Sequence, residues 1–249
     1  MNLLEPFLAL FIAHLIGDFV LQTEQMALKK GRVLSWLMLH ALELGLITWL
    51  LCWTFKAWPV VVVVFLTHLV FDWVKPRLKG HPLQWYVADQ LAHVFTLLLC
   101  SIWMSKVLPA MPLSSLVPTS VQVLIAAYLT ILRPLTIGMG LFLKPWQDEV
   151  ARSNGNAAPE GSITGLTRSS EWIGNLERFF VLTAVVAQQE YLVVGLLIAK
   201  AIMRVPELLK GEHRRRADYI IIGTFGSVGL AFAVGVLANA ALALCGGPP

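Results

Sequence analysis

Charged residues are scarce in this chain, and their scarcity excludes a water-soluble domain. Only 14% of the 249 residues are Asp, Glu, Lys or Arg, whereas 57% are hydrophobic and the mean hydropathy is +0.71. A soluble domain averages roughly 25% charged residues because its surface must be polar. The lipid bilayer imposes the opposite composition, since each charge inside it costs free energy. We therefore predict an all-α polytopic transmembrane helix bundle.

Cysteine is also scarce, and familiar catalytic signatures are missing from the sequence. Cys52, Cys100 and Cys245 fall in or beside apolar runs without CxxC spacing, which is typical of small hydrophobic residues. The sequence contains no HExxH, GxSxG, P-loop or Rossmann fingerprint. These absences exclude the enzyme classes that depend on those motifs.

Long apolar runs are abundant, and each run of roughly 20 residues predicts a membrane-spanning helix. The candidate spans are residues 4–22, 34–54, 57–74, 87–108, 114–143 and 218–244. A further apolar segment, 172–208, brings the expected number to about 6–8 membrane helices. The first span lacks a basic leader and contains His14 and Asp18, so we expect it to stay in the mature protein.

Basic residues are distributed asymmetrically about these spans. Two clusters follow the first and third spans: Lys29, Lys30, Arg32, Lys75, Arg77 and Lys79. The opposite ends carry only Lys56 and Lys106. By the positive-inside bias we predict an N-terminus outside a bacterial cytoplasmic (inner) membrane. Because the basic groups do not gather on one soluble face, we expect membrane lipid and not nucleic acid as the partner.

The chain divides into four predicted segments. Residues 1–108 form a half with four antiparallel helices, and residues 109–143 form a transmembrane helix kinked at Arg133–Pro134. Residues 144–170 are polar and predict a flexible cytoplasmic loop. Residues 171–249 form a helical hairpin and the last transmembrane helix.

The hairpin has one alternative, in which residues 172–208 cross the membrane once. A single crossing would place the strongest basic cluster, Lys210 with 214–216, on the outer side. A hairpin that turns at Gln188–Tyr191 keeps this cluster cytoplasmic, and its arms of about 24 Å suit a re-entrant segment. We therefore favour the hairpin. The nearby Gly223, Gly226 and Gly229 predict close packing of the last helix.

Histidine and aspartate recur four residues apart in three of the predicted spans. Residues at this spacing share one helix face. With one histidine from the second span, the candidate metal ligands are His14, Asp18, His40, His68, Asp72, Asp89 and His93. Under the predicted topology all seven lie at one depth, toward the cytoplasmic face.

A divalent metal explains this cluster better than a purely structural polar network. Interhelical His–Asp hydrogen bonds could hold a bundle together. Buried carboxylates without cations, however, would repel one another and be forced to protonate. We expect zinc, with manganese or iron as alternatives. Seven groups exceed the four that one zinc needs, which favours two metals or one metal with additional catalytic groups.

Other residues are assigned supporting roles. Lys75 lies seven residues after His68 and, together with Arg133 and Arg178, is predicted to bind an anionic substrate. The simpler alternatives are a topology-determining lysine and arginines that anchor at the interface. Three residues are predicted to orient the ligands: Gln22, Glu43 and Gln90.

The chain resembles a prokaryotic membrane family catalogued as domain of unknown function 3307. The resemblance rests on HLIGDFVLQT at 14–23, HLVFDWVK at 68–75 and DQLAH at 89–93. Toward the C-terminus GNLERF at 174–179, AKAIMR at 199–204 and DYIIIGT at 218–224 are also similar, whereas 144–170 is not. The resemblance implies membership and no activity. A looser similarity is to membrane-bound metal-dependent hydrolases.

The leading functional hypothesis is a metal-dependent hydrolase that acts on a lipid or lipid-linked phosphate. A water activated by the cation would attack, and Asp18, Asp72 or Asp89 would act as catalytic base. A metal-ion or proton-coupled transporter is the first alternative, although carrier sites typically lie near the membrane midplane. A non-catalytic scaffold with a structural polar network is the second.

Overall fold

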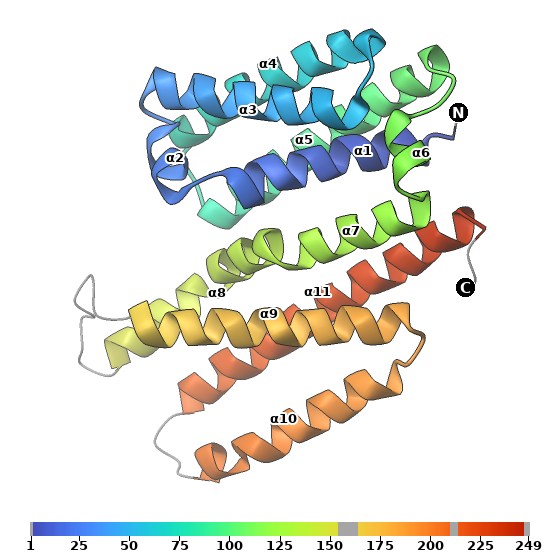
Figure 1. The fold of residues 1–249 in the computed structure, drawn as a ribbon. Helices are drawn as coiled ribbons and strands as arrows, with labels where there is room; N and C mark the ends of the chain where they lie inside the picture. Colours follow the sequence, from blue (N-terminus) through green and yellow to red (C-terminus); the bar gives the residue numbers. More distant parts are fainter. Residues whose placement is uncertain (1, 154–163, 210–213, 247–249) are drawn as a thin grey trace. The chain divides into compact units, whose positions relative to one another are not determined.

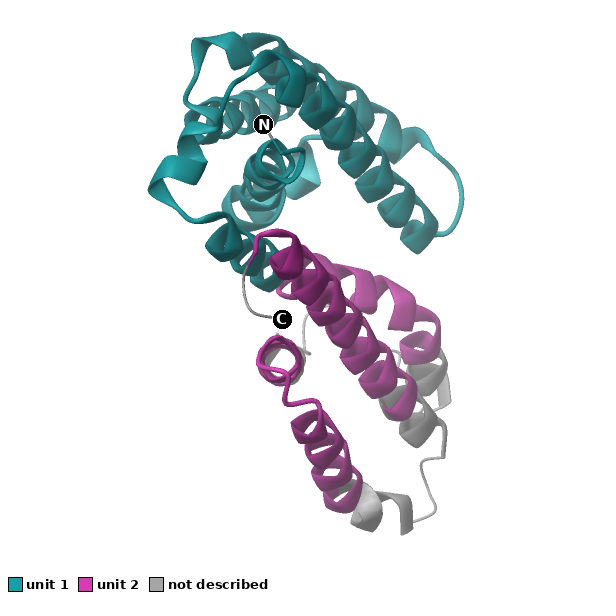
Figure 2. Cartoon of the chain, turned by 90° about the vertical axis from the view of Figure 1, so that its right-hand side faces the viewer, with its two compact units in different colours: residues 1–129 teal, residues 130–249 magenta. Residues whose placement is uncertain are grey.

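The computed structural model is an all-α polytopic helix bundle (Figure 1). It describes residues 2–153, 164–209 and 214–246, with side chains for 2–148, 171–203 and 221–246. Within these residues every element is a helix. The chain divides into two compact units, Met1–Leu129 and Thr130–Pro249 (Figure 2).

Unit 1 contains the long antiparallel helices that the apolar runs predict. They are α1 (Leu4–Leu15), α3 (Leu34–Cys52), α4 (Trp58–Val74) and α5 (Pro82–Val107). Helix α5 begins five residues before the predicted span because Pro82 occupies its first turn and the His81 side chain accepts a hydrogen bond from Leu83 N. Short elements join them: α2 (Glu24–Lys29), the 3-10 turns Phe55–Ala57 and Lys75–Arg77, and α6 (Pro112–Leu116).

The helices of unit 1 pack α1 against both α3 and α5, and α3 against α4 (Figure 1). Apolar side chains fill the interior, and Leu10, Leu44 and Leu97 are fully buried there. At Gly17 an added Cβ would lie 2.2 Å from the Leu44 side chain. A glycine at this position therefore permits the end of the first span to approach α3 closely.

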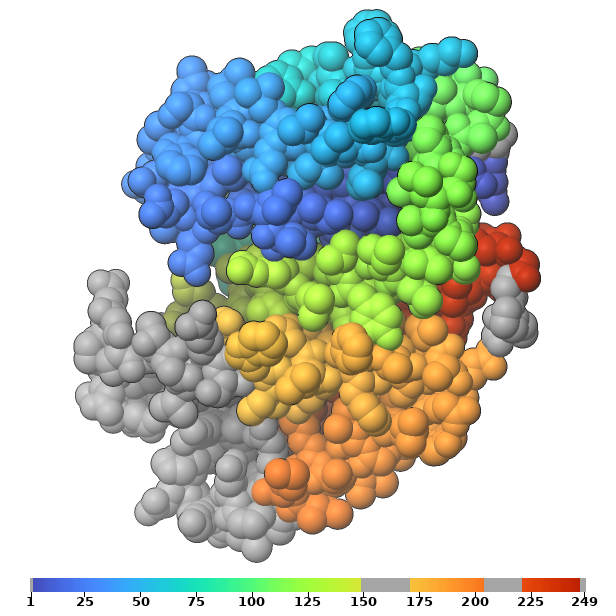
Figure 3. Space-filling view, in the orientation of Figure 1, coloured from blue at the N-terminus to red at the C-terminus, as the bar shows by residue number. Residues whose placement is uncertain are grey.

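Among the residues that the structure describes, six helical segments are long and apolar enough to cross a membrane. They are Leu4–Leu21, Leu34–Cys52, Phe55–Arg77, Pro82–Val107, Thr119–Asp148 and Ile221–Leu244. Large apolar side chains are exposed along them, and Leu42, Leu46 and Leu50 of α3 are examples. Figure 3 draws this helix in blue. Exposed apolar faces on such helices fit a lipid environment, so this is an integral membrane protein.

At the predicted kink the helix is interrupted at a single residue. Helix α7 (Thr119–Ile131) ends before Leu132, and α8 (Arg133–Ser153) begins after it. Pro134 explains the break, since proline lacks a backbone N–H and clashes with the preceding turn. In unit 2 the buried Arg178 donates from Nε to the Ile131 carbonyl at 2.8 Å. The Ile131 carbonyl thus receives from Arg178 a hydrogen bond that the interrupted helix does not provide.

The prediction of a loop over residues 144–170 was wrong at both ends. Helix α8 continues through Ser153, and α9 (Thr164–Val186) begins at Thr164. Hydropathy detects a segment that suits the membrane, and it does not detect a polar helix. The middle of the predicted loop, 154–163, lies outside the described residues.

The segment after α9 forms a hairpin. A turn at 187–190, where Gln188 has a φ of 57°, leads into α10 (Tyr191–Leu209), which packs back on α9 (Figure 1). The turn lies where the sequence predicts it. Glu177 of α9 and Lys200 of α10 form an ion pair at 2.7 Å across the two arms. The last helix, α11 (Arg214–Leu244), packs on both α8 and α9.

Glycines mediate the packing of α11, although not all of the predicted ones do. A Cβ at Gly223 would lie 3.1 Å from Leu143, and one at Gly226 would lie 3.3 Å from Met139. Gly229 has nothing within 4 Å, so the prediction of close packing there was wrong. The tightest approach is at Gly235, where a Cβ would meet Val185 at 2.7 Å.

Candidate metal centre

The candidate site lies where the four long helices of unit 1 come together. His14 is in the last turn of α1, and His68 is near the end of α4. His40 lies in the first half of α3, and His93 lies in the first half of α5. Because neighbouring helices run in opposite directions, these positions come to the same level. All four histidines are at most 2% exposed.

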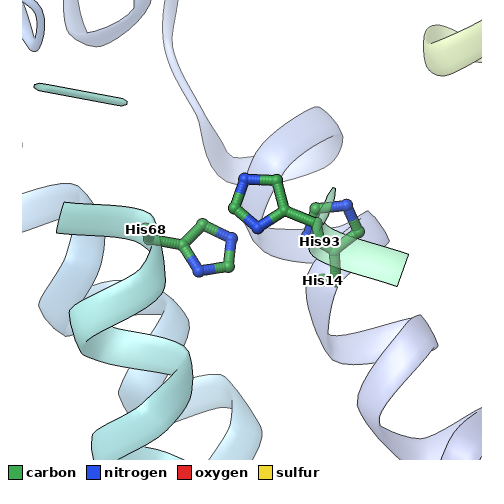
Figure 4. A group of neighbouring side chains, drawn as sticks. All are labelled: His14, His68 and His93. Atoms are coloured by element: carbon green, nitrogen blue, oxygen red, sulfur yellow. The ribbon is translucent and has the colours of Figure 1, made fainter. Parts of the chain in front are cut away.

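Three histidines converge most closely. His14, His68 and His93, called here the three-histidine group, each offer a ring nitrogen within 4.8 Å of the other two (Figure 4). The rings of His68 and His93 are stacked, with centroids 4.1 Å apart. A tetrahedral zinc holds each nitrogen at about 2.0–2.1 Å, so ligation would draw the rings together. The group could hold a metal ion.

Hydrogen bonds prepare two of these rings for ligation. His68 Nδ1 lies 2.8 Å from the Val64 carbonyl, and His14 Nε2 lies 3.2 Å from the Gln90 amide oxygen. Since both oxygens only accept, these nitrogens carry the protons. The opposite nitrogens, His68 Nε2 and His14 Nδ1, are buried without a hydrogen-bond partner among the described residues. They present the lone pairs that a cation requires, in the arrangement found around protein-bound metals.

Asp18 connects the three-histidine group to His40. One carboxylate oxygen lies 2.9 Å from His40 Nε2 and 3.9 Å from His68 Nε2, and the other lies 3.7 Å from His14 Nδ1. Asp18 occupies a π-helical turn, Ile16–Leu21, in which Gln22 N bonds to the Gly17 carbonyl. Such wide turns frequently mark functional sites. The sequence spacing did not predict this turn.

Asp72 and Lys30 form one flank of the site. Lys30 Nζ lies 2.9 Å from both carboxylate oxygens, and Asp72 Oδ2 is also 3.5 Å from His40 Nε2. The chain reaches this position through α2, whose first turn is capped by the Thr23 hydroxyl. The following Gly31 fits against Pro76, where a Cβ would lie 2.5 Å from the proline ring.

The sequence pattern did not indicate Lys30 as a site residue, because basic residues after the first span were interpreted as determinants of membrane topology. It lies outside the helical spacing of the His/Asp pairs, since α2 and the turn after it carry it back toward α4. The only signal in the sequence was a lysine close to the end of the first span. A contact 42 residues distant in the chain does not follow from that signal.

Asp89 and Lys75 form the other flank. Lys75 Nζ lies 2.6 Å from Asp89 Oδ2, and His93 Nε2 lies 3.6 Å from Asp89 Oδ1. The Gln90 amide nitrogen also donates to Asp89, at 3.3 Å, so Gln90 joins this flank to His14. The Lys75 side chain is 36% exposed, compared with 14% for Lys30. The flank of Lys75 is therefore the more open one.

Of the remaining predicted residues, Gln22 and Glu43 belong to unit 1. Gln22 is half-buried, and its Oε1 is buried without a hydrogen-bond partner among the described residues. Glu43 is half-buried on α3. Arg133 and Arg178 belong to unit 2. Arg133 is exposed.

Arg178 is engaged within unit 2. Besides the Ile131 carbonyl, its guanidinium donates to three side-chain acceptors: Ser227, Asn175 and Thr136. Only 4% of the residue is exposed. These bonds show a residue that ties α8, α9 and α11 together, and they leave its predicted role in substrate binding without support.

The chemistry of the donors fits a divalent cation with nitrogen and oxygen ligands. Three neutral imidazoles and one adjacent carboxylate match the ligand types of zinc, manganese and ferrous iron. The other two carboxylates each face a lysine, which offsets their burial cost. Three protein ligands leave coordination positions for water or substrate, as in catalytic zinc sites.

Comparison with known proteins yields a family and no characterised relative. No curated protein and no solved structure matches the chain. One family model matches residues 7–132, a range that includes all seven candidate ligands and both flanking lysines. The C-terminal segments that resemble the same family lie outside this range. The chain belongs to the family described as protein of unknown function DUF3307.

Proposed function

We propose that this protein is a metal-dependent membrane hydrolase that acts on a lipid or lipid-linked phosphate. The observation that carries the proposal is the pair of buried, unpartnered nitrogens on His14 and His68, whose opposite nitrogens are already hydrogen-bonded. Each such nitrogen left unpaired costs about 1–3 kcal/mol. A cation bound between them offsets that cost.

The residues divide into distinct roles in this proposal. The three-histidine group would hold the cation, which would supply Lewis-acid activation of water and of the phosphoryl oxygen. Asp18 would accept the proton of the attacking water, since it touches the group without being held by a lysine. His40, at 2.9 Å from Asp18, would hold that carboxylate in place.

The flanks of the site favour an anionic substrate. Lys75 is partly exposed and borders Asp89, so an incoming anion could share its ammonium group with that carboxylate. The carboxylates and lysines lie toward one end of the apolar segments, but His14, His68 and His93 lie near the middle of Leu4–Leu21, Phe55–Arg77 and Pro82–Val107. Because carrier sites typically lie near the midplane, a metal-ion carrier is the second candidate function.

Metal analysis of the purified full chain tests the first step. We expect at least about one tightly bound divalent metal per chain, as one catalytic site requires. The double substitution His68→Ala/His93→Ala should abolish it. His81→Asn is the matched control, since His81 is exposed and asparagine retains its capping function. Equal metal content in the double variant and the control would contradict the proposal.

Turnover and transport are separated by a second experiment. Proteoliposomes that contain the metal-loaded protein should release phosphate or a headgroup from lipid, and Asp18→Asn should lower the rate at least about a hundredfold, the usual contribution of a positioned base. Glu24→Gln, an exposed acid in the same unit, is the control. Metal uptake without lipid turnover would instead favour the carrier.

A further inference from the structure

The charges at the site have a definite sum within unit 1. Asp18, Asp72 and Asp89 contribute three negative charges, and Lys30 and Lys75 contribute two positive charges. The histidines that bind a cation must be neutral. With His40 also counted as neutral, the side chains sum to −1, and a divalent cation changes the sum to +1.

A buried site of this kind binds most favourably the ligand that restores neutrality. Uncompensated charge in a low-dielectric interior is expensive, and all three carboxylates are at most 9% exposed. One additional negative charge gives a sum of zero. A doubly charged ligand would give −1 and would face three carboxylates with too few cations. The site therefore discriminates by ligand charge.

We propose that the ligand of this site is a singly charged phosphodiester and that Lys75 is the residue that contacts its phosphate. This inference rests on the proposed hydrolase and specifies its substrate class. Water would add to phosphorus and one P–O ester bond would break. One water proton would pass to the departing alkoxide, giving an alcohol, and the other would pass through Asp18 to solvent, giving a doubly charged phosphomonoester. The doubly charged product no longer matches the site, which favours its release.

The two lysines differ in a way that assigns the contact to Lys75. Lys30 is 14% exposed and lies 2.9 Å from both oxygens of Asp72, so its ammonium is enclosed. Lys75 is 36% exposed and contacts one oxygen of Asp89. Its ammonium has donors left for a second anion. Lys30 instead fixes the charge of the opposite flank.

Binding of two soluble probes to the zinc-loaded full chain in detergent tests the proposal. Bis(p-nitrophenyl) phosphate is a singly charged diester, and p-nitrophenyl phosphate is the doubly charged monoester. Calorimetry should show that the diester binds at least about tenfold more tightly. Lys75→Gln should weaken diester binding about tenfold without changing the zinc content. Glu24→Gln should change neither value.

A substitution that removes one negative charge from the site tests the proposal more stringently. Asp72→Asn keeps the size of the side chain and raises the net charge of the zinc-loaded site to +2. The binding preference should therefore shift from the diester toward the monoester. Asp89→Asn makes the same change on the other flank and replaces the first variant if that one does not fold. A structural role for these carboxylates would lower stability without reversing a ligand preference.

The outcomes separate this inference from the proposed function. Tighter binding of the monoester to the unmodified protein, or no binding of either probe, overturns the phosphodiester assignment. Selective diester binding without hydrolysis supports the phosphodiester assignment and contradicts the proposed hydrolase function. Phosphatidylcholine vesicles with phosphatidylglycerol or with phosphatidic acid then identify the source of the diester. Turnover of the soluble probe and not of phosphatidylglycerol indicates a soluble ligand.

Discussion

Histidine tautomers are the residue-scale feature on which the candidate site depends. An imidazole binds a metal through a lone pair, and a neutral ring has only one. The Val64 carbonyl determines which nitrogen of His68 is free, and Gln90 does the same for His14. A sequence pattern of histidines four residues apart contains neither piece of information. The site is thus defined by groups beyond the ligands themselves.

Removing the partner of His14 should therefore weaken metal binding. In Gln90→Leu the imidazole loses its acceptor, so the ring can rotate or exchange its proton. We expect zinc affinity to fall about 10–100-fold, as for other residues that orient metal ligands. Competition with a chromogenic chelator measures this change. Gln84→Leu is the control, because Gln84 is exposed on the same helix. Equal affinities in the two variants would show that Gln90 does not orient His14.

At the scale of elements, close helix approach decides whether the predicted ligands meet. Hydropathy located the membrane helices, but the contact of Gly17 with Leu44 brings the π-helical turn that carries Asp18 against α3. Likewise, the helix break at Leu132 follows from Pro134, whereas its bracing by Arg178 is a tertiary contact. Spacing along one helix predicts which ligands share a helix face. Packing between helices sets the distances between ligands on different helices.

Gly17→Ala should destabilise the protein by overpacking this contact. The added Cβ would lie 2.2 Å from the side chain of Leu44, which is fully buried. We expect a loss of about 1–3 kcal/mol in the free energy of unfolding. Leu44→Ala in the same chain should recover part of this loss, whereas Leu44→Ala alone should destabilise. A simple sum of the two single effects would contradict the proposed contact. Denaturant titration in mixed micelles provides the measurement.

Arg178→Met should destabilise unit 2 through unpaired acceptors. The substitution keeps an apolar stem and removes the donors to Ile131, Ser227, Asn175 and Thr136. Each buried acceptor left without a partner costs about 1–3 kcal/mol, so a total of several kcal/mol is expected. Arg133→Met, at an exposed position, should stay within about 0.5 kcal/mol of the unmodified protein. Similar losses in both variants would show that Arg178 does not brace the helix break.

At the scale of the whole molecule, the candidate centre would link α1, α4 and α5. A cation held by His14, His68 and His93 binds the folded unit and not the unfolded chain. Metal removal should therefore lower stability by about 2.7 kcal/mol when the free metal concentration is a hundred times its dissociation constant. Thermal unfolding with and without a chelator measures the difference. In the His68→Ala/His93→Ala variant the chelator should have no effect.

The topology of the molecule in its membrane stays a prediction, and it can be checked by labelling. Introduced cysteines report sidedness once Cys245, the partly exposed native cysteine, is changed to serine. Lys56→Cys should react with an impermeant maleimide added to intact cells, and Lys79→Cys should react only after the membrane is opened. The reverse pattern would place the N-terminus inside.

The sequence by itself determined that the chain spans membranes, where most of its helices lie, and which seven residues could form a site. These conclusions follow from composition and from helical periodicity, which are local properties. Tertiary structure alone decided the role of Lys30, the π-helical turn at Asp18 and the tautomer of His68. Each depends on a contact or a backbone hydrogen bond that hydropathy and spacing do not encode. The physical reason is that charge compensation and lone-pair direction are set by distances between helices.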